Sequence, residues 1–499
     1  MGIVLILAVA VLTAWLIKAK STSPPKLNMP YLRFDGDNSL MRYLSGTTSL
    51  MDKGYSQYLK KGIPFAMRNP ADPKRPQVLL PMKYLAEVRN APQNQLSFPL
   101  FSAQAFLLKP IYGPEQTDEA AHMARLDLNR ALNNLLEPMN EECIAGMKKV
   151  VPLCADWTPA PPYHFIVYMV ARMTARVMVG AELSGDDEWV GQSIQTTMNV
   201  MNASQSVRAK YHPWMRWLAQ YFDEPTKVVI KNRKRAIELL RPVLNARKAA
   251  LDSQSKGEKS KYNDGVQWLL EEYRGLGKDL TVERLAQDEL FLTIASTHST
   301  SATLLSTLFD LMDHPDSLKE IREEISQMQL QNPTVNRQAL NGMRVLDSFL
   351  KESQRIHSLS LVTMQRTSVS GFTFRDGLHI PANTQLSFPN QHLNWDDDVN
   401  EDAKKFDAKR WVRKREEIDP NKFHFGSVSE DSINFGNGFH TCPGRFLAQQ
   451  VLKLVFINLL QNYEFKWQDE DGKRPPNLTN EFALTPNPTV PILIRARKH

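Results

Sequence analysis

The chain has 499 residues, of which 42% are hydrophobic and 23% charged, a balance typical of a globular protein with a large core rather than of a disordered one. Its formal charge is +7, yet no Lys/Arg block and no basic stripe interleaved with aromatic residues predicts a nucleic-acid groove. Three cysteines without a CxxC pair exclude a disulfide framework and a cysteine-rich zinc site, and they are typical of a reducing compartment.

The chain begins with an apolar run over residues 3–17, closed by Lys18 and Lys20. The run is slightly shorter than the roughly 20 residues that span a bilayer, but snorkelling lysines and local thinning can close this gap. A cleaved signal peptide is the alternative, although such peptides carry basic residues before the apolar run and none precedes Ile3. We therefore expect a retained transmembrane anchor over residues 1–20, with the rest of the chain in the cytosol by the positive-inside rule.

Three prolines stiffen residues 21–30 into an extended tether, and a single folded domain is expected over residues 31–499. Up to about residue 355, apolar residues recur at helical spacing. The predicted helices cover residues 120–136, 166–179, 228–251, 282–311 and 317–328. After residue 360 short β-prone pieces with turns predominate, and one more helix is expected near residues 445–460. The chain is therefore expected to be mainly α with a small β part.

The predicted helix over residues 282–311 contains a run rich in serine and threonine, including Ser299 and Thr300 next to His298. Such side chains compete for backbone hydrogen bonds and can bend a helix. Something other than helix propensity must keep this run helical.

Glu352 and Arg355 stand three residues apart and so share one face of a helix. Alone, such a pair arises by chance in charged helices, and when exposed it stabilises by about 1 kcal/mol or less. The segment from Phe406 to Arg410 follows before the last helix.

Cys442 follows a tight-turn sequence, Gly436-Asn437-Gly438, whose backbone can take positive φ. Pro443 is suited to the first position of a helix, which would place Cys442 at a helix N-terminus, where free N–H groups favour a thiolate. Such a sulfur can bind a cation. A buried free cysteine, a nucleophile paired with His440 and one ligand of a zinc site are the alternatives, although further zinc ligands and a third orienting group are lacking nearby.

This loop resembles that of the cytochrome P-450 superfamily, whose pattern is Phe-x-x-Gly-x-x-x-Cys-x-Gly. Phe435, Gly438, Cys442 and Gly444 match every fixed position. The resemblance implies that family's helical fold over residues 31–499, haem b as the cofactor and the Cys442 thiolate as the iron ligand.

The resemblance also implies that Glu352, Arg355 and Arg410 form a buried triad that fixes geometry. The family's Pro-Glu before the last arginine is Ala408-Lys409 here, which puts the local loop shape in doubt.

His440 and Arg366 match positions that bind the haem propionates in the family, and an exposed strand residue is the alternative for Arg366. The family's Trp-x-x-x-Arg on an early helix is absent, and Arg130 is a possible substitute.

In the family, the central helix reads Ala-Gly-x-Asp/Glu-Thr, in which an acid and an alcohol relay protons. Here Ala295 and Ser296 are small residues that leave space over the iron, as the small residue does in the family. His298 replaces the acid, and Ser299 with Thr300 replaces the alcohol. The relay implied for these residues is therefore an altered one.

The function implied is a monooxygenase that uses dioxygen to oxidise a lipophilic small molecule. The chain looks similar to fungal members of the ent-kaurene oxidase-like kind, which favours a terpenoid-type natural product. Electrons would come from NADPH through a membrane-bound reductase at the endoplasmic reticulum. That reductase could meet five basic residues, Lys409, Arg410, Arg413, Lys414 and Arg415. Alternatives are a haem-thiolate isomerase or dehydratase that needs no NADPH, and a non-catalytic haem-binding membrane protein.

The walls of the substrate pocket are expected from residues 90–112, the first half of the helix over 282–311, and residues 195–225, which hold Met198, Trp214 and Trp217. Residues 360–364 and 484–486 are expected to complete them. Plain core packing is the alternative for each of these residues. Such walls would suit a fairly large apolar substrate.

Overall fold

The computed structural model describes residues 27–72, 75–253, 260–332, 334–469 and 471–498. The predicted anchor over residues 1–20 and residues 21–26 of the tether lie outside this part of the chain. Among the described residues, no helix combines the length and apolar character needed to cross a bilayer. Backbone contacts divide the chain into two units, each made of segments that are distant in sequence, where the sequence predicts one domain over residues 31–499.

The smaller unit comprises the described residues up to Phe101 together with Val362–Pro389 and Thr479–Phe482. Its core is a six-stranded sheet of order β1-β2-β3-β9-β6-β4, in which β3 and β9 are parallel and Val78 pairs with Leu386. The six strands are β1 (Tyr31–Leu32), β2 (Phe65–Met67), β3 (Gln77–Leu79), β4 (Leu96–Ser97), β6 (Val362–Ser368) and β9 (Gln385–Pro389). A separate hairpin pairs β7 (Phe372–Thr373) with β8 (His379–Ile380). The helices here are α2 (Leu40–Gln57), η1 (Leu59–Lys61), η2 (Met82–Tyr84) and α3 (Leu85–Asn90), while α4 (Phe98–Ala105) runs on into the other unit.

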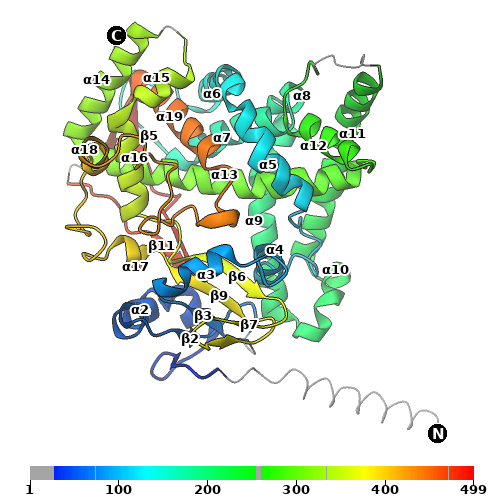
Figure 1. Ribbon diagram of the computed structural model, residues 1–499. Coiled ribbons are helices and arrows are strands. Elements are labelled where there is room, and N and C mark those ends of the chain that lie inside the picture. Colours follow the sequence, from blue (N-terminus) through cyan, green and yellow to red (C-terminus); the bar gives the residue numbers. More distant parts are fainter. Residues whose placement is uncertain (1–26, 73–74, 254–259, 333, 470, 499) are drawn as a thin grey trace, which may run out of the picture. The chain divides into compact units, whose positions relative to one another are not determined.

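The larger unit is helical and holds the central helix α13 (Val282–Asp313). The Thr281 hydroxyl caps its start by accepting the Arg284 N–H, and most of its side chains are buried. Helix α13 packs against α7 (Pro162–Met178), α9 (Asp187–Lys210), α11 (Glu224–Asp252) and α16 (Arg344–Ile356), and Figure 1 shows it running across this unit. Packing against these neighbours keeps the serine- and threonine-rich run helical, and the hydroxyls are satisfied by donating to carbonyls one turn earlier, as Ser301 does to Thr297 over 2.7 Å.

The larger unit contains further helices. They are α5 (Asp118–Ala131), η3 (Leu132–Leu135), α6 (Leu136–Val150), α8 (Ala181–Ser184), η4 (Pro213–Leu218), α10 (Ala219–Phe222), α12 (Gly265–Gly275), α14 (Pro315–Gln331), α15 (Arg337–Gly342), α17 (Gln391–Asn394), α18 (Arg410–Glu417), η5 (Gly438–His440) and α19 (Arg445–Asn462). Of these, α12, α14 and α19 also contact α13. A small sheet has the order β10-β13-β5. Its strands are β5 (Thr158–Ala160), β10 (Tyr463–Trp467) and β13 (Ile492–Ala496), and the short strands β11 (Leu478–Asn480) and β12 (Ala483–Thr485) lie between β10 and β13 in sequence.

The mainly α prediction with a small β part is confirmed. The predicted helix over residues 120–136 is too long, because α5 ends at Ala131 and a separate turn and helix follow. The long helix α9 is absent from the prediction, since its sequence carries polar residues on all sides.

Candidate active site

The segment before α19 folds into a tight turn that ends at Cys442. Gly436 and Gly438 have φ values of 75°, whereas Asn437 between them is extended with a φ of −150°. The Cys442 N–H donates to the Phe435 carbonyl over 2.8 Å and so ties the end of the turn to its start. The positive φ values expected in this turn are therefore supplied by the two glycines alone, because a Cβ disfavours that backbone region.

Pro443 does not occupy the first position of the helix, contrary to the prediction. Helix α19 starts at Arg445 with Gly444 as its N-cap, and its first hydrogen bond runs from the Ala448 N–H to the Gly444 carbonyl. The chain leaves the turn through Pro443 and Gly444 before it becomes helical. Cys442 is still close to the helix start, because the N–H groups of Gly444 and Arg445 both donate to its sulfur.

Two opposing effects act on the Cys442 thiol. Burial raises its pKa above the usual value, while the Gly444 and Arg445 N–H groups and the Arg445 charge lower it. Burial wins, so the helix start alone does not produce a thiolate here, in contrast to the simple expectation from sequence. Across the described parts of the chain, no group of three or more His, Cys, Asp or Glu side chains is arranged to hold a metal ion.

Glu352 is fully buried and is surrounded by hydrogen-bond donors. Arg355 donates Nε to its Oε2 over 3.0 Å and Nη2 to its Oε1 over 2.7 Å, and Arg410 adds Nε over 3.2 Å. The indole of Trp411 and the backbone N–H of Asp407 complete the set, each over 3.1 Å. The structure thus brings together Glu352, Arg355 and Arg410, and the two guanidinium groups also donate to carbonyls of the segment before α18.

A second buried network ties α16 to the segment that leads into the Cys442 turn, and sequence reasoning missed it. Lys351 is 3% exposed and donates Nζ to the Ser427 carbonyl over 3.1 Å. Burial lowers the pKa of Lys351 to about 8. One turn earlier, buried Asp347 accepts from Lys453 over 2.9 Å and pairs with Arg415 over 3.1 Å. A lysine directly before Glu352 was the available signal, but a charged helix gives no indication that it is buried.

Ala295 and Ser299 are exposed on α13, although most of that helix is buried. They lie one turn apart on one face, and the Ser299 hydroxyl donates to the Ala295 carbonyl over 2.9 Å. Ser296 is half-buried, whereas Thr300 is only 7% exposed. The middle of α13 therefore has an exposed, open face made of small side chains, where space for the cofactor was expected. The Ser299 hydroxyl lies on this face.

The His298 ring is half-buried and contacts two neighbouring helices, unlike the exposed Ser299. The relay role expected for it stays a prediction. Its Nδ1 lies 2.7 Å from the Tyr163 hydroxyl and its Nε2 lies 2.7 Å from the Ile194 carbonyl, on α7 and α9. Burial lowers the His298 pKa. Both ring nitrogens are thus engaged by neighbouring helices.

Arg366 lies on β6 in the smaller unit and is 3% exposed, so it is not an exposed strand residue. Its Nη1 donates to the Gln365 carbonyl over 2.7 Å, but its buried Nε has no hydrogen-bond partner among the described residues. Burial without a counter-ion lowers its pKa to about 10. Such an arginine is suited to an anionic group. His440, in the larger unit, is half-buried, and its ring meets Phe439 edge to face with centroids 5.1 Å apart.

Arg130, the possible substitute on the early helix, is exposed and faces Asp127 over 3.9 Å. Arg125 on the same helix is better placed, because its guanidinium lies 4.3 Å from the ring centroid of Phe439 in the Cys442 turn. Asn129 of α5 also donates to the Pro443 carbonyl over 3.3 Å. Helical periodicity places these residues on one helix but cannot say which side faces the turn.

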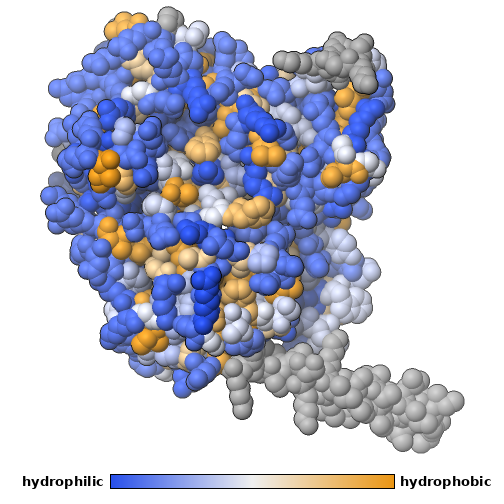
Figure 2. Space-filling view, viewed as in Figure 1, coloured by the Kyte–Doolittle hydropathy of each residue, from blue (hydrophilic) through white to orange (hydrophobic). Residues whose placement is uncertain are grey.

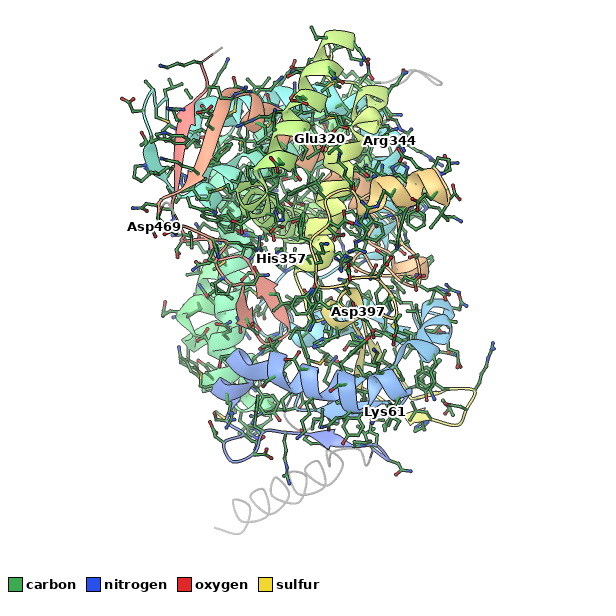
Figure 3. The ribbon with its side chains drawn as sticks, turned by 90° about the vertical axis from the view of Figure 1, so that its left-hand side faces the viewer. Lys61, Glu320, Arg344, His357, Asp397 and Asp469 are labelled. Carbon is green, nitrogen blue, oxygen red and sulfur yellow. The ribbon has the colours of Figure 1, made fainter. Side chains whose placement is uncertain are left out.

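The five basic residues expected to meet a reductase are already engaged within the larger unit. Arg410 and Arg415 are buried in ion pairs with Glu352 and Asp347, so they are not available at the surface. Lys409 pairs with Glu320 of α14, which Figure 3 labels together with Arg344 of α16. Arg413 pairs with Asp407, and Lys414 lies over aromatic rings of Trp411 and Phe423. A basic run in sequence therefore does not form a free basic patch here.

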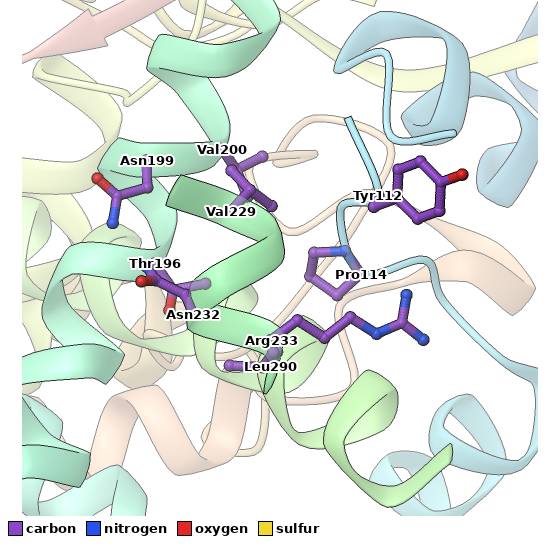
Figure 4. A pocket seen from close by; sticks show the side chains of 9 residues that line it. All are labelled: Tyr112, Pro114, Thr196, Asn199, Val200, Val229, Asn232, Arg233 and Leu290. Carbon is purple, nitrogen blue, oxygen red and sulfur yellow. The ribbon is translucent and has the colours of Figure 1, made fainter. Parts of the chain in front are cut away.

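The predicted pocket walls are only partly where they were expected. Met198, Trp214 and Trp217 are 49%, 58% and 59% exposed, so they line no closed pocket. A small cavity does lie between α9, α11 and the segment before α5, and Figure 4 shows its lining by residues that include Tyr112 and Arg233. Its apolar lining comes from Pro114, Val200, Val229 and Leu290.

The protein is mainly helical, and a tight turn places one cysteine, Cys442, next to the start of a helix. The family model described as Cytochrome P450 matches residues 123–493, and the chain belongs to this family. Members of this family carry haem b and receive electrons from an NADPH-dependent reductase. The relatives of this chain are named monooxygenases, so the chain is a haem-dependent monooxygenase.

Known relatives match almost the whole chain. The cytochrome P450 monooxygenase cheE of Chaetomium globosum is 40% identical over 99% of this chain and 96% of its own length. The cytochrome P450 monooxygenase CYP2 of Pyricularia oryzae is 43% identical over 89% of this chain and 91% of its own length. The pyrichalasin C-7 hydroxylase of Pyricularia grisea is 37% identical, with 94% and 92% covered.

The residues present fit a haem group. In the larger unit, Cys442 offers a free sulfur next to the start of α19. In the smaller unit, the buried Nε of Arg366 has no hydrogen-bond partner among the described residues and suits an anionic group. Ala295 and Ser299 leave an open face on α13.

Proposed function

We propose that this monooxygenase binds haem through the Cys442 thiolate. The turn around Cys442 carries this assignment, because two glycines with positive φ set the course of its backbone and the N–H groups of Gly444 and Arg445 donate to the sulfur. Phe435, Gly438 and Gly444 shape the turn. Arg366 and His440 would hold the propionates, with Arg125 as a further basic group beside the turn.

The test of this ligand is the absorption of the reduced protein with carbon monoxide. We expect the Soret band near the wavelength that gives the family its name, and we expect Cys442→Ala to abolish it. Cys143→Ala and Cys154→Ala are matched controls, because both thiols are buried in the hydrophobic core. An unchanged band in Cys442→Ala would overturn the assignment.

When bound, haem b supplies the activation of dioxygen and the transfer of one oxygen atom to a C–H bond. The protein has to exclude water, orient the substrate and deliver protons. Ser299 is the group we assign to proton delivery, because its hydroxyl lies on the open face of α13 and needs only a rotation about χ1 to leave the Ala295 carbonyl. Thr300 is buried and supports the helix instead.

Ser299→Ala should keep haem binding and substrate-induced spectral shifts but lower the product formed per NADPH, because reducing equivalents then leave as peroxide. Thr300→Val should change this ratio much less. Product and peroxide are measured together in one reconstituted reaction with a reductase. If Thr300→Val uncouples the enzyme and Ser299→Ala does not, the two roles are reversed.

We propose a lipophilic natural product as the substrate, hydroxylated at a ring or chain carbon. Support comes from the relative named pyrichalasin C-7 hydroxylase, which the chain matches over 94% of its length, and this favours a pyrichalasin-like compound. The resemblance to ent-kaurene oxidase-like members favours a terpenoid instead. Incubation with a reductase, NADPH and a 7-deoxy pyrichalasin-type compound or an ent-kaurene-type diterpene, followed by mass spectrometry, separates the two. One added oxygen atom in only one of them identifies the class.

The same incubation also tests the isomerase alternative. Product formation that requires NADPH and dioxygen would exclude an isomerase. Such an enzyme has no need for an alcohol on the open face, whereas Ser299 supplies one here. A non-catalytic haem protein would form no product with either compound. Turnover without NADPH would overturn the monooxygenase reaction for this substrate.

We also propose that the protein works at the endoplasmic reticulum membrane with its described part in the cytosol. The apolar run over residues 3–17 supports this, as does an exposed aromatic cluster that comprises Trp214, Trp217, Tyr221 and Phe222. These side chains are 58%, 59%, 58% and 71% exposed. The face shown in Figure 2 is mostly hydrophilic, with small separate apolar groups. Tryptophan and tyrosine are enriched where protein meets lipid headgroups.

A further inference from the structure

His298 stands where the family has an acid, but its surroundings are those of a neutral ring. Its Nε2 lies 2.7 Å from the Ile194 carbonyl, which can only accept a hydrogen bond, so Nε2 carries the proton. In a neutral imidazole Nδ1 then has a lone pair, and the Tyr163 hydroxyl, 2.7 Å away, donates to it. The two bonds fix one tautomer.

No charged side chain perturbs this pair. Burial lowers the His298 pKa, while the hydrogen bond to the Ile194 carbonyl opposes this shift, and burial alone raises the Tyr163 pKa to about 12. Both groups are therefore neutral at physiological pH. A ring with both nitrogens engaged has no free site from which to pass a proton onward.

The pair also joins three helices at one point. His298 lies in the middle of α13, Tyr163 in the first turn of α7 and Ile194 in the first half of α9. Ser299 is the next residue along α13 and is turned by about 100° around the helix axis. Any rotation of α13 that would move the Ser299 hydroxyl must break the bonds that His298 makes.

We propose that His298 and Tyr163 are a positioning pair that fixes the rotation of α13 and thereby aims Ser299 at the open face. This rests on the proposed function of Ser299. The pair replaces the acid of the relay rather than imitating it. A carboxylate at this position would set an acceptor against the Ile194 carbonyl, so the acid found in the family does not suit this site.

The sharpest test compares His298→Gln with His298→Glu in the haem-loaded full chain. The two side chains have nearly the same shape, but only glutamine can donate to the Ile194 carbonyl and accept from Tyr163 without first taking up a proton. We expect His298→Gln to keep most of the product formed per NADPH, and His298→Glu to lose it. Tyr163→Phe removes one bond and should speed amide hydrogen exchange in the middle of α9 and α13 by about fivefold.

A second readout follows the imidazole itself. In Tyr163→Phe the His298 Nδ1 loses its donor, so the pKa of the ring should rise, and its NMR signal should titrate at a higher pH than in the wild type. Coupling of the variant should then fall off at a higher pH on the acid side.

Three results would overturn the pairing. His298→Glu that couples as well as or better than wild type would mean that position 298 is a relay acid after all. Unchanged amide hydrogen exchange in Tyr163→Phe would mean that the hydrogen bond between Tyr163 and His298 does not fix the position of α13. Loss of stability in all three variants, with normal coupling in the folded fraction, would leave only a structural role. A missing carbon monoxide band in the wild type would instead refute the haem assignment and leave the exchange result standing.

Discussion

At the scale of single residues, the buried charge of Glu352 is the clearest case of a group whose surroundings decide its effect. It is fully buried, and two arginines, one indole and one backbone N–H donate to it. Removing one arginine leaves a carboxylate that is desolvated and only partly compensated. Ion pairs of this kind add little net stability while intact but are costly to break.

Arg355→Ala should therefore lower the free energy of unfolding by roughly 3–5 kcal/mol, enough to prevent accumulation of haem-loaded protein. Arg413→Ala is the matched control, since Arg413 is exposed and pairs with Asp407 nearby in the chain; it should cost about 1 kcal/mol or less. Thermal unfolding and haem content of the purified variants are the measurements. Equal effects of the two substitutions would show that the burial of Glu352 has no energetic consequence.

Residue types that carry their own chemistry could be predicted from sequence, and those that act through packing could not. Cys442 with its glycines could be predicted from the turn sequence, whereas the grouping of Glu352 with its two arginines was implied by the resemblance to the family's motifs. Lys351, Arg125 and Tyr163 are ordinary residues in the sequence. Their roles depend on which helix faces which, and this is decided by tertiary packing that periodicity does not reach.

At the scale of elements, α13 holds two acids next to each other in its buried first half. Glu289 is fully buried, and neither carboxylate oxygen has a hydrogen-bond partner among the described residues. Burial raises its pKa well above the usual value, with Asp288 and Asp264 adding to the effect. Asp288 accepts from Thr117 and Tyr273, and burial raises its pKa to about 6. Burial thus shifts both groups towards the protonated form relative to an ordinary carboxyl, most strongly at Glu289.

A raised carboxyl pKa has a definite sign for stability. The folded chain holds protons that the unfolded chain has released, so this contribution is fully present below the ordinary pKa and is lost as the pH rises through the folded value. Glu289→Met removes one such group and should raise the melting temperature more at pH 8 than at pH 5. Glu283→Gln, exposed on the same helix near Arg241, should change neither. A larger gain at pH 5 would contradict the protonated state inferred for Glu289.

Long helices with an apolar stripe were found within a few residues of their true ends, as α11 and α13 show. Helix α9 was missed because its polar residues lie on all sides, and the strands β1 to β4 were missed because they span only two or three residues. Strands so short contain too few residues for an alternating pattern, and β3 also depends on β9, about 300 residues later in the chain.

At the scale of the whole molecule, two features bear on the proposed membrane location. Deleting residues 1–20 should reduce the fraction of protein that sediments with membranes without affecting the carbon monoxide band. The shortened protein should still bind membranes weakly through the exposed aromatic cluster. Substituting Trp214→Ser together with Trp217→Ser should remove this remaining membrane binding.

Flotation with phosphatidylcholine and phosphatidylserine vesicles measures both effects. Leu330→Ser is the control, because Leu330 is 86% exposed on another helix and should have no influence. Binding that is unaffected by the tryptophan substitutions in the shortened chain would exclude the aromatic cluster as a membrane contact. A mature N-terminus near residue 20 would show instead that the first segment is cleaved.

The sheet of the smaller unit sets a condition on the order of events during synthesis. Its strand β3 pairs with β9, which leaves the ribosome about 300 residues later, and residues 479–482 of the same unit come later still. At about 5–20 residues per second, the first strands wait roughly 15–60 s for their partners. During this interval their unpaired edges are exposed to other chains, so protection by a chaperone during translation should matter more for this unit than for the helices of the larger one.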